Sequence, residues 1–191
     1  MEADEYNGPE YGRSLNGTRV LRISRSAHEN LKKNNQMKIG TWNVRSMNEE
    51  GKVENTIQEM KRLKLSILGI SEMRWTGSGQ CEVDDHMIYY SGKDSIHQNG
   101  VAVIMEKTIS RSVKNVIPFS DRIIVIQLET APVNTNIIQV YAPTSNADDE
   151  EVESLYENLR YLKNQLKNNE MTILMGDLNS KIGKGKQDCI V

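Results

Sequence analysis

Short runs of apolar residues, bounded by turn formers, recur along most of this chain and predict a protein rich in β-strands. The proline of Ala142-Pro143 closes the last of these runs, because proline cannot extend a strand within a sheet. A stretch rich in turn formers, residues 77–85, is expected to form a loop. The expected strands lie at residues 37–44, 66–71, 86–90, 100–105, 122–128 and 136–141.

Two segments have the spacing of amphipathic helices. In residues 51–65, Val53, Ile57 and Met60 fall near one face. The second helix begins at an acidic run, residues 148–151, where the helix dipole favours negative charge. The acidic run is therefore explained without a metal. The apolar face of this second helix is expected to carry Val152, Leu155, Tyr156, Leu159, Leu162 and Leu166.

Residues 171–179, MTILMGDLN, combine a predicted strand with candidate chemistry. Side chains two positions apart in a strand point the same way, so Asp177 and Asn179 are expected to emerge together after Gly176. An acid beside an amide can take a proton from water and donate a hydrogen bond to an oxyanion. The alternative interpretation is a strand that ends in an Asx turn.

The order strand, helix, strands, helix, strand favours an α/β fold of two packed sheets with helices outside. We expect residues 1–36 to form a polar tail with a short ordered turn near 20–23, and residues 37–191 to form one domain. The tail is basic in its second half. It is interpreted as a solvated linker, with a phosphate-seeking arm or nuclear-import signal as alternatives. Its basic residues are Arg19, Arg22, Arg25, Lys32 and Lys33.

Composition narrows the function classes. The 191 residues are 37% hydrophobic and 26% charged, which is typical of a soluble globular protein. No apolar run is long enough to cross a bilayer, and Cys81 and Cys189 lack zinc or redox spacing; we therefore expect an intracellular protein, nuclear or cytoplasmic, without membrane contact. Residues 37–191 hold 18 Lys and Arg against 21 Asp and Glu, so contact with a polyanion must be local or assisted by a divalent cation.

Polar residues recur where predicted strands end. They are Asn43 in TWNVR, Glu72 in SEMRW, Tyr141 in VYAPT, and Asp177 with Asn179 in GDLN. Ligand sites on sheets are built from such ends.

Each of these residues also has a structural alternative. Glu72 could form a surface ion pair with Arg74, Tyr141 could be a packed core residue, and Asn43 could be a turn former. Other polar and aromatic residues are interpreted more simply. Trp42 and Trp75 are expected to pack, His97 to be an exposed loop histidine, and Asp121 with Arg122 to form an ion pair or a substrate contact.

Taken in order, TWNVR, ISEMRW, QVYAPT and MGDLN resemble the endonuclease/exonuclease/phosphatase superfamily, the DNase I-like fold. Within it, TWNVRSM, LGISEMRWTGSG and QVYAPTS resemble retrotransposon-derived domains of the craniofacial development protein 2-like group, close to LINE-type endonucleases. The resemblance covers about residues 37–183. It implies a four-layered α/β sandwich that cleaves phosphodiesters with a divalent metal, Mg²⁺ or Mn²⁺. The implied partner is nucleic acid, with DNA favoured over RNA.

The resemblance also implies roles for individual residues. Asn43 and Glu72 match metal-side positions, and magnesium accepts one or two carboxylates with waters and substrate phosphate. Tyr141 matches a tyrosine that hydrogen-bonds the scissile phosphate. Asp177 matches the acid that orients or deprotonates the attacking water, and Asn179 the amide that steadies the pentacovalent phosphate. Arg74 is a candidate substrate-binding residue.

The superfamily pattern continues past the GD-x-N strand with a later acid and a closing Asp-His pair. The three histidines of this chain, His28, His86 and His97, all lie upstream, and Asp188 is too close to Asn179 to be the later acid. We therefore expect a C-terminally truncated domain with impaired activity. Two alternatives are an inactive interaction module and a phosphatase acting on inositol or lipid phosphates.

Overall fold

Two sheets dominate the computed structural model, which describes residues 12–13, 19–23 and 37–180. One has seven strands in the order β1-β2-β3-β4-β7-β6-β5, and the other has four in the order β11-β10-β9-β8. The strands are β1 (Gly12–Arg13), β2 (Arg19–Ile23), β3 (Met37–Asn43), β4 (Ile67–Ser71), β5 (Ser78–Val83), β6 (His86–Ser91), β7 (Val101–Glu106), β8 (Val113–Ser120), β9 (Ile123–Leu128), β10 (Thr135–Tyr141) and β11 (Met171–Asp177). The helices are α1 (Lys52–Leu63), α2 (Lys107–Ser110) and α3 (Asp149–Gln165).

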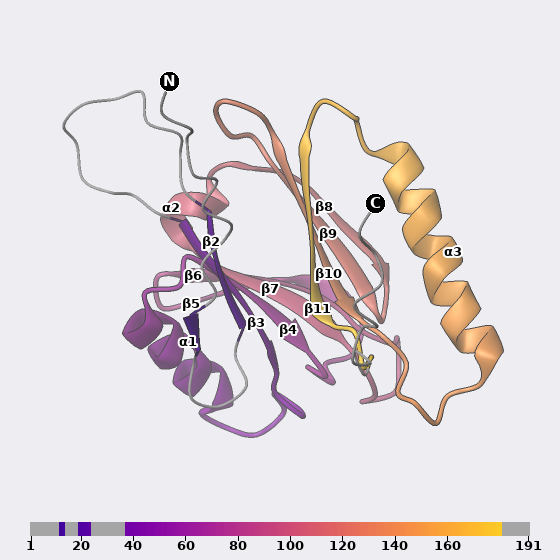
Figure 1. The fold of residues 1–191 in the computed structure, drawn as a ribbon. Coiled ribbons are helices and arrows are strands. Elements are labelled where there is room, and N and C mark those ends of the chain that lie inside the picture. The colour runs from indigo at the N-terminus through magenta and orange to yellow at the C-terminus, as the bar shows by residue number, and fades with distance from the viewer. Residues whose placement is uncertain (1–11, 14–18, 24–36, 181–191) are drawn as a thin grey trace.

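The two sheets pack face to face, with α1 outside one and α3 outside the other (Figure 1). The inner faces meet in a core that includes Ile67, Val103, Ile126 and Ile137. A second cluster joins α1 to the seven-stranded sheet, and a third joins Leu155 and Leu162 of α3 to the four-stranded sheet. The predicted four-layered α/β sandwich is confirmed.

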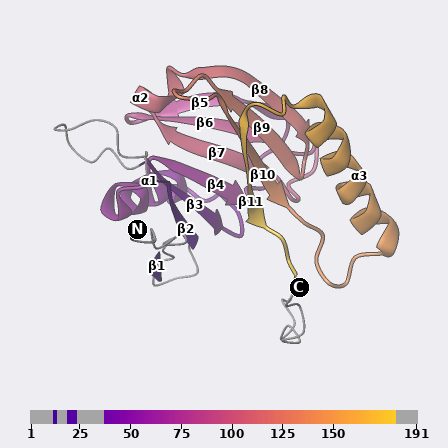
Figure 2. The same cartoon turned by 45° about the horizontal axis from the view of Figure 1, so that its top comes forward.

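Two parallel pairs bring strand ends together. β3 runs parallel to β4, with Asn43 opposite Ser71, and β10 runs parallel to β11, with Tyr141 opposite Asp177. All other paired strands are antiparallel. Figure 2 shows the arrowheads of β3, β4 and β11 at one end of the sandwich. The carboxyl ends from both sheets therefore meet there.

Three segments differ from the sequence-based expectation. Residues 78–83, expected in a loop, form β5, which pairs along its whole length with β6. Residues 113–120 form β8, a strand that the sequence did not indicate; Pro118 interrupts its apolar pattern, and the register shifts beside it. Residues 19–23, near the expected turn, form β2 and pair with β3. Apart from β1 and β2, residues 1–36 lie outside the described residues.

Helix α3 begins as its acidic run predicts. Asp148 is the N-cap, its side chain accepts a hydrogen bond from the Glu151 amide at 2.8 Å, and acidic residues fill the first turn. Replacing Asp148 with alanine removes this acceptor. We expect a loss of about 1 kcal/mol in the free energy of unfolding, measured by urea denaturation. The exposed mid-helix variant Glu157→Ala is the control, and an equal loss there would contradict a capping role.

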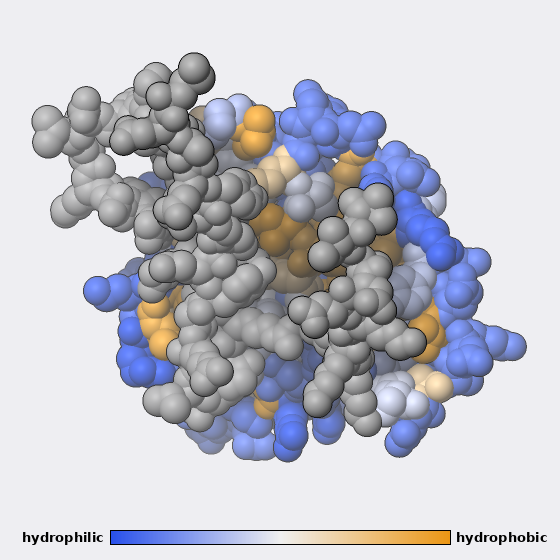
Figure 3. Space-filling model, in the orientation of Figure 1, coloured by the Kyte–Doolittle hydropathy of each residue, from blue (hydrophilic) through white to orange (hydrophobic). Residues whose placement is uncertain are grey.

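The surface in Figure 3 is mostly hydrophilic around its margin, with apolar side chains in a hollow at the centre of this face. Met37 of β3 and Ile173 and Met175 of β11 are half-buried against the core between the sheets. Within the described part of the chain, no helix has the length and apolarity to span a bilayer.

Candidate active site

Four polar side chains from both sheets meet at the strand ends and are joined by hydrogen bonds. The Asn43 amide Nδ2 donates to Glu72 Oε1 at 2.8 Å and to Asp177 Oδ2 at 2.9 Å. The Tyr141 hydroxyl donates to the same Glu72 Oε1 at 3.0 Å. We call these four residues the strand-end cluster. Asn43 and Asp177, which are 134 positions apart in the sequence, are thus in direct contact.

The loops that carry this cluster are held in an unusual backbone conformation. Of the eight described non-glycine residues with positive φ, six lie on loops at this end of the sandwich. Positive φ is costly for side chains with a Cβ, and such residues concentrate at functional sites. The six residues are Arg45, Ser46, Glu72, Arg74, Asn99 and Asn179.

Glu72 lies just past β4, and both oxygens of its carboxylate accept hydrogen bonds. Oε1 accepts hydrogen bonds from Asn43 and Tyr141, and Oε2 accepts one from Arg74 Nη2 at 3.3 Å. The side chain of Arg74 is 45% exposed, so its guanidinium also faces solvent. The ion pair considered as an alternative for Glu72 therefore exists, and it joins Arg74 to the cluster.

Tyr141 is both a packed residue and a member of the cluster. Its side chain is buried against the core between the sheets while its hydroxyl reaches Glu72. Burial, reinforced by the hydrogen bond to Glu72, raises the pKa of Tyr141 to about 12. The Arg122 guanidinium lies 5.1 Å from the ring centroid and pairs with Glu151 of α3. Tyr141 is therefore a fixed, protonated hydrogen-bond donor.

Asp177 and Asn179 leave β11 in different directions. Asp177 Oδ2 faces Asn43, while Oδ1 accepts a hydrogen bond from the Asn179 backbone amide at 3.1 Å, as in an Asx turn. Asn179 has φ +46°, and its side chain donates to the Ala142 carbonyl at 2.7 Å. The alternation expected from a strand thus ends at Asp177, because a turn follows. Asn179 lies beside the cluster, and its side chain forms no hydrogen bond with those of Glu72 or Tyr141 among the described residues.

The remaining candidates fall where simple packing predicts. Trp42 and Trp75 pack against the α1 side of the seven-stranded sheet, and Trp75 meets Tyr90 edge-on at 5.2 Å. His97 is exposed, and its Nδ1 lies 2.8 Å from the Arg74 carbonyl. It therefore contacts the loop behind Glu72, although it is not part of the cluster.

One supporting pair escaped the sequence analysis. Asn99 Nδ2 donates to Asp121 Oδ2 at 2.6 Å, and the Asn99 carbonyl accepts from the Arg74 amide at 2.8 Å. This pair fixes the loop that carries Glu72 and Arg74. Asp121 thus bonds an amide, and Arg122 pairs with α3, so the two do not pair with each other. The only available signal was the polar HQNG loop before an apolar run, which does not identify a partner 22 residues away.

The cluster suits a divalent cation. Two carboxylates, Glu72 and Asp177, converge on one point, where they are joined only by the amide group of Asn43. Mg²⁺ in proteins takes one or two carboxylates and completes its shell with water and substrate oxygens. In the part of the chain that the structure describes, no group of three or more His, Cys, Asp and Glu side chains could hold a metal. Glu72 and Asp177 thus supply two carboxylates, which is fewer ligands than a closed, all-protein metal cage uses.

The sequence of this chain is similar to those of known proteins. Residues 40–184 match the model of the Endonuclease/Exonuclease/phosphatase family. Craniofacial development protein 2 from Bos taurus is 44% identical over 145 residues, which cover 76% of this chain and 24% of that protein. The protein of the same name from Tragulus javanicus is 43% identical over 145 residues, 76% of this chain and 25% of that protein. The chain spans about a quarter of the length of these curated relatives.

Solved structures share the fold at low sequence identity. The endonuclease domain of TRAS1, a telomere-specific non-LTR retrotransposon, has a TM-score of 0.56 at 16% identity, covering 76% of this chain and 60% of that chain. The AP endonuclease of Leishmania major has a TM-score of 0.57 at 16% identity, covering 75% and 55%. A 3′ phosphatase from Neisseria, bound to product DNA hairpin, has a TM-score of 0.56 at 22% identity, covering 75% and 58%. Because the family model matches most of the length of this chain, and solved structures share its fold, the chain belongs to the endonuclease/exonuclease/phosphatase family.

Proposed function

We propose that this chain hydrolyses phosphodiester bonds in DNA with the help of Mg²⁺ or Mn²⁺. The observation that carries the proposal is the convergence of Glu72 and Asp177 on the Asn43 amide, with the Tyr141 hydroxyl beside them. Membership of a family of endonucleases, exonucleases and phosphatases supports hydrolysis of phosphate esters in general.

Glu72 and Asn43 are the residues that would hold the metal, Glu72 through its carboxylate and Asn43 through its side-chain oxygen Oδ1, which in this structure accepts a hydrogen bond from the Arg45 backbone amide. When bound, the ion supplies a Lewis acid and a sink for the negative charge of the transition state. The chain's own groups then bind the phosphate. For this, Tyr141 would turn its single hydroxyl hydrogen from Glu72 to a phosphate oxygen, and Asn179 would donate the amide hydrogen that the Ala142 carbonyl does not take, while Arg74 adds a guanidinium at the exposed edge.

Asp177 orients the attacking water and takes its proton. The water oxygen forms a new bond to phosphorus in line with the leaving sugar oxygen, whose bond to phosphorus breaks, and the leaving oxygen is protonated from solvent. A free carboxylate oxygen is required for this role. Asp177 retains acceptor capacity beyond its contacts with Asn43 and the Asn179 amide, because each carboxylate oxygen can accept more than one hydrogen bond.

DNA is the proposed substrate because the Neisseria phosphatase holds product DNA and the Leishmania enzyme is named an AP endonuclease. A retrotransposon origin is part of the proposal; its support is the shared fold of the TRAS1 endonuclease domain and the sequence motifs above. Because the net charge of the chain is −2, no overall basic excess attracts DNA, and the proposed contact with DNA is local to the strand-end cluster.

Metal removal tests the proposal. Supercoiled plasmid is incubated with the purified chain in Mg²⁺, in Mn²⁺, and after chelation with EDTA, and nicked circles are quantified. We expect nicking with either cation and its loss on chelation, reversed by excess Mg²⁺. Parallel incubations with single-stranded RNA and with inositol phosphates compare substrate classes. Hydrolysis of inositol phosphates without plasmid nicking would favour a phosphatase over an endonuclease. Absence of activity on every substrate would favour an interaction module.

Replacing Tyr141 with phenylalanine is expected to lower the nicking rate by about 10²-fold, because one phosphate donor is lost while the packed ring stays. The pH dependence supplies an independent readout. Since the pKa of Tyr141 is raised to about 12, its phenol stays protonated at neutral pH and well above it. The rate profiles of wild type and Tyr141→Phe from about pH 6 to about pH 10 should therefore have the same shape. A basic limb present only in the wild type would contradict the donor role.

The same raised pKa affects stability in a defined direction. The folded chain holds the Tyr141 proton more tightly than the unfolded chain does. Its contribution is therefore complete below about pH 10 and is lost as the pH rises toward about 12.

A further inference from the structure

A buried amide lies between the two sheets, just behind the strand-end cluster. Gln139 is 0% exposed and lies on β10 between Ile137 and Tyr141, the residues two positions away, both of which belong to the core between the sheets. Because side chains two positions apart in a strand share a face, Gln139 points into the same core. A strongly polar group therefore occupies an apolar interior.

This amide bonds to Ser71, the one other polar residue that is 0% exposed in the described part of the chain. Gln139 Nε2 donates a hydrogen bond to Ser71 Oγ at 3.0 Å, and the Ser71 hydroxyl donates to the Val140 carbonyl at 3.4 Å. Ser71 ends β4 in the seven-stranded sheet, whereas Gln139 and Val140 belong to β10 in the four-stranded sheet. The pair therefore links the two sheets by hydrogen bonds.

The other end of the amide is unpaired. Gln139 Oε1 is buried and has no hydrogen-bond partner among the described residues. It lies over Gly69 of β4, where an added Cβ would be 1.9 Å from Oε1. The amide thus extends along β4 from Gly69 to Ser71. An unpaired buried carbonyl oxygen costs free energy, so an apolar side chain of similar length would be at least as stable at this position.

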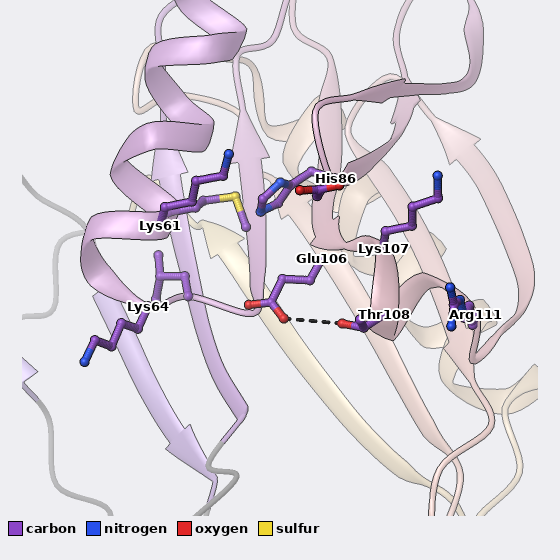
Figure 4. A pocket seen from close by; sticks show the side chains of 10 residues that line it. Lys61, Lys64, His86, Glu106, Lys107, Thr108 and Arg111 are labelled. Carbon is purple, nitrogen blue, oxygen red and sulfur yellow. Dashed lines mark hydrogen bonds between the residues drawn. The ribbon is translucent and has the colours of Figure 1, made fainter.

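The described residues contain one other buried side-chain atom without a partner, Nδ1 of His86. His86 pairs with the end of β7 and Ser71 with its start, so the two lie at opposite ends of the seven-stranded sheet. Figure 4 shows His86 on the wall of a pocket of about 560 Å³. The cations around this pocket are accompanied by carboxylates. Of the two unpaired atoms, only Gln139 Oε1 is therefore near the strand-end cluster.

Both partners of the buried hydrogen bond are close in sequence to residues of the cluster. Ser71 directly precedes Glu72, which leaves β4 with φ +57°, and Gln139 lies two positions before Tyr141. The hydrogen bond from Tyr141 to Glu72, at 3.0 Å, joins the same two segments. Apolar contacts have no preferred direction, whereas a hydrogen bond requires defined positions of donor and acceptor. The buried pair thus adds a directional contact within the apolar interface.

We propose that Gln139 is a positioning residue for the strand-end cluster: its hydrogen bond to Ser71 sets β4 against β10 so that Glu72 and Tyr141 meet. The expected effect on nicking rests on the proposed function, whereas the expected effect on the Tyr141–Glu72 contact does not. Buried polar groups can confer structural specificity at a cost in stability. Removal of the amide should therefore disturb the site without destabilising the fold.

Gln139→Met tests this proposal, because methionine is unbranched and of similar length but has no amide. Its thermal unfolding midpoint should equal or exceed that of the wild type, while the nicking rate falls about tenfold or more. Gln127→Met is the matched control. The Gln127 amide donates to Asn136 at 2.9 Å within the four-stranded sheet, at the end of β9 away from Tyr141, so nicking should not change. Equal losses of nicking in the two variants would contradict the proposal.

Ser71→Ala supplies the other side of a double-mutant cycle. It leaves the Gln139 amide without a partner at either end, so both the unfolding midpoint and the nicking rate should fall. Adding Gln139→Met to Ser71→Ala should restore the midpoint but not the nicking rate. Recovery of both would show that the pair acts through stability alone, and would overturn the positioning role.

A measurement without metal or DNA separates this inference from the nuclease proposal. The chain is labelled with ¹³C at the Cζ atom of tyrosine, and the Tyr141 NMR signal is identified by its loss in Tyr141→Phe. We expect this signal to shift in Gln139→Met, because the contact of the hydroxyl with Glu72 changes, and to stay in place in Gln127→Met. An unshifted signal in Gln139→Met would overturn the proposal. A shifted signal in a chain whose wild type does not nick would support the positioning role and count against the nuclease proposal alone.

Discussion

Replacing Asp177 with alanine is expected to lower magnesium-dependent plasmid nicking by about 10²–10⁴-fold. The substitution removes the proposed proton acceptor for the attacking water. It also removes one of the two carboxylates that converge on Asn43, so the local negative charge that attracts a cation falls by half. The measurement is the initial rate of conversion of supercoiled to nicked plasmid at saturating Mg²⁺.

Two controls separate chemistry from folding. Asp149→Ala removes an exposed carboxylate of the first turn of α3 that forms no hydrogen bond with the strand-end cluster, and this variant should retain nearly all nicking activity. The thermal unfolding midpoint of Asp177→Ala reports whether the sandwich persists. If the wild-type chain shows no magnesium-dependent nicking above the Asp177→Ala background, the enzymatic proposal fails for this chain.

Replacing Gly176 with alanine is expected to destabilise the protein by about 2–4 kcal/mol and to abolish nicking. Gly176 has φ +142°, and a Cβ at this position would lie 1.9 Å from the carbonyl oxygen of Val140. Because that atom belongs to the backbone of β10, the contact is relieved only by separating β11 from β10. Asp177, the next residue, would move with the strand and lose its position beside Asn43.

Urea unfolding gives the magnitude for Gly176→Ala. Gly77→Ala is the matched control, because Gly77 also has positive φ, +69°, but has no atom within 4 Å of the added Cβ. We expect about 1–2 kcal/mol there, from backbone strain alone. If the two variants lose the same stability, the close approach between β10 and β11 is not what requires glycine at 176.

The strands that were predicted correctly are those whose burial gives them an unbroken apolar run. β4, β9 and β10 are buried along nearly their whole length, so their composition alone identifies them. β5 is mostly exposed, and the only apolar residues in its sequence SGQCEV are Cys81 and Val83, too few to indicate a strand; it forms one because β6 offers a paired edge. β8 was hidden by Pro118, which the sheet accepts because β8 is an edge strand.

The candidate site was predictable where it depends on strand ends, and unpredictable where it depends on partners across the fold. The sequence placed Asn43, Glu72, Tyr141 and Asp177 after apolar runs, and the structure joins all four by hydrogen bonds. It did not indicate that Arg122 would lie over the Tyr141 ring while pairing with α3. Such contacts follow from the packing of distant elements, which no local pattern encodes.

The strand-end cluster is divided between the two sheets: β3 and β4 carry Asn43 and Glu72, while β10 and β11 carry Tyr141 and Asp177. Neither half has a complete set of polar groups, and what holds the halves in register is the apolar interface between the sheets. If one sheet slid over the other, Asp177, the proposed proton acceptor, would move away from Glu72, the carboxylate proposed to hold the metal, although no strand would change. The proposed catalysis therefore depends on the apolar interface between the sheets, and substitutions inside that interface are expected to lower activity without changing any residue of the cluster.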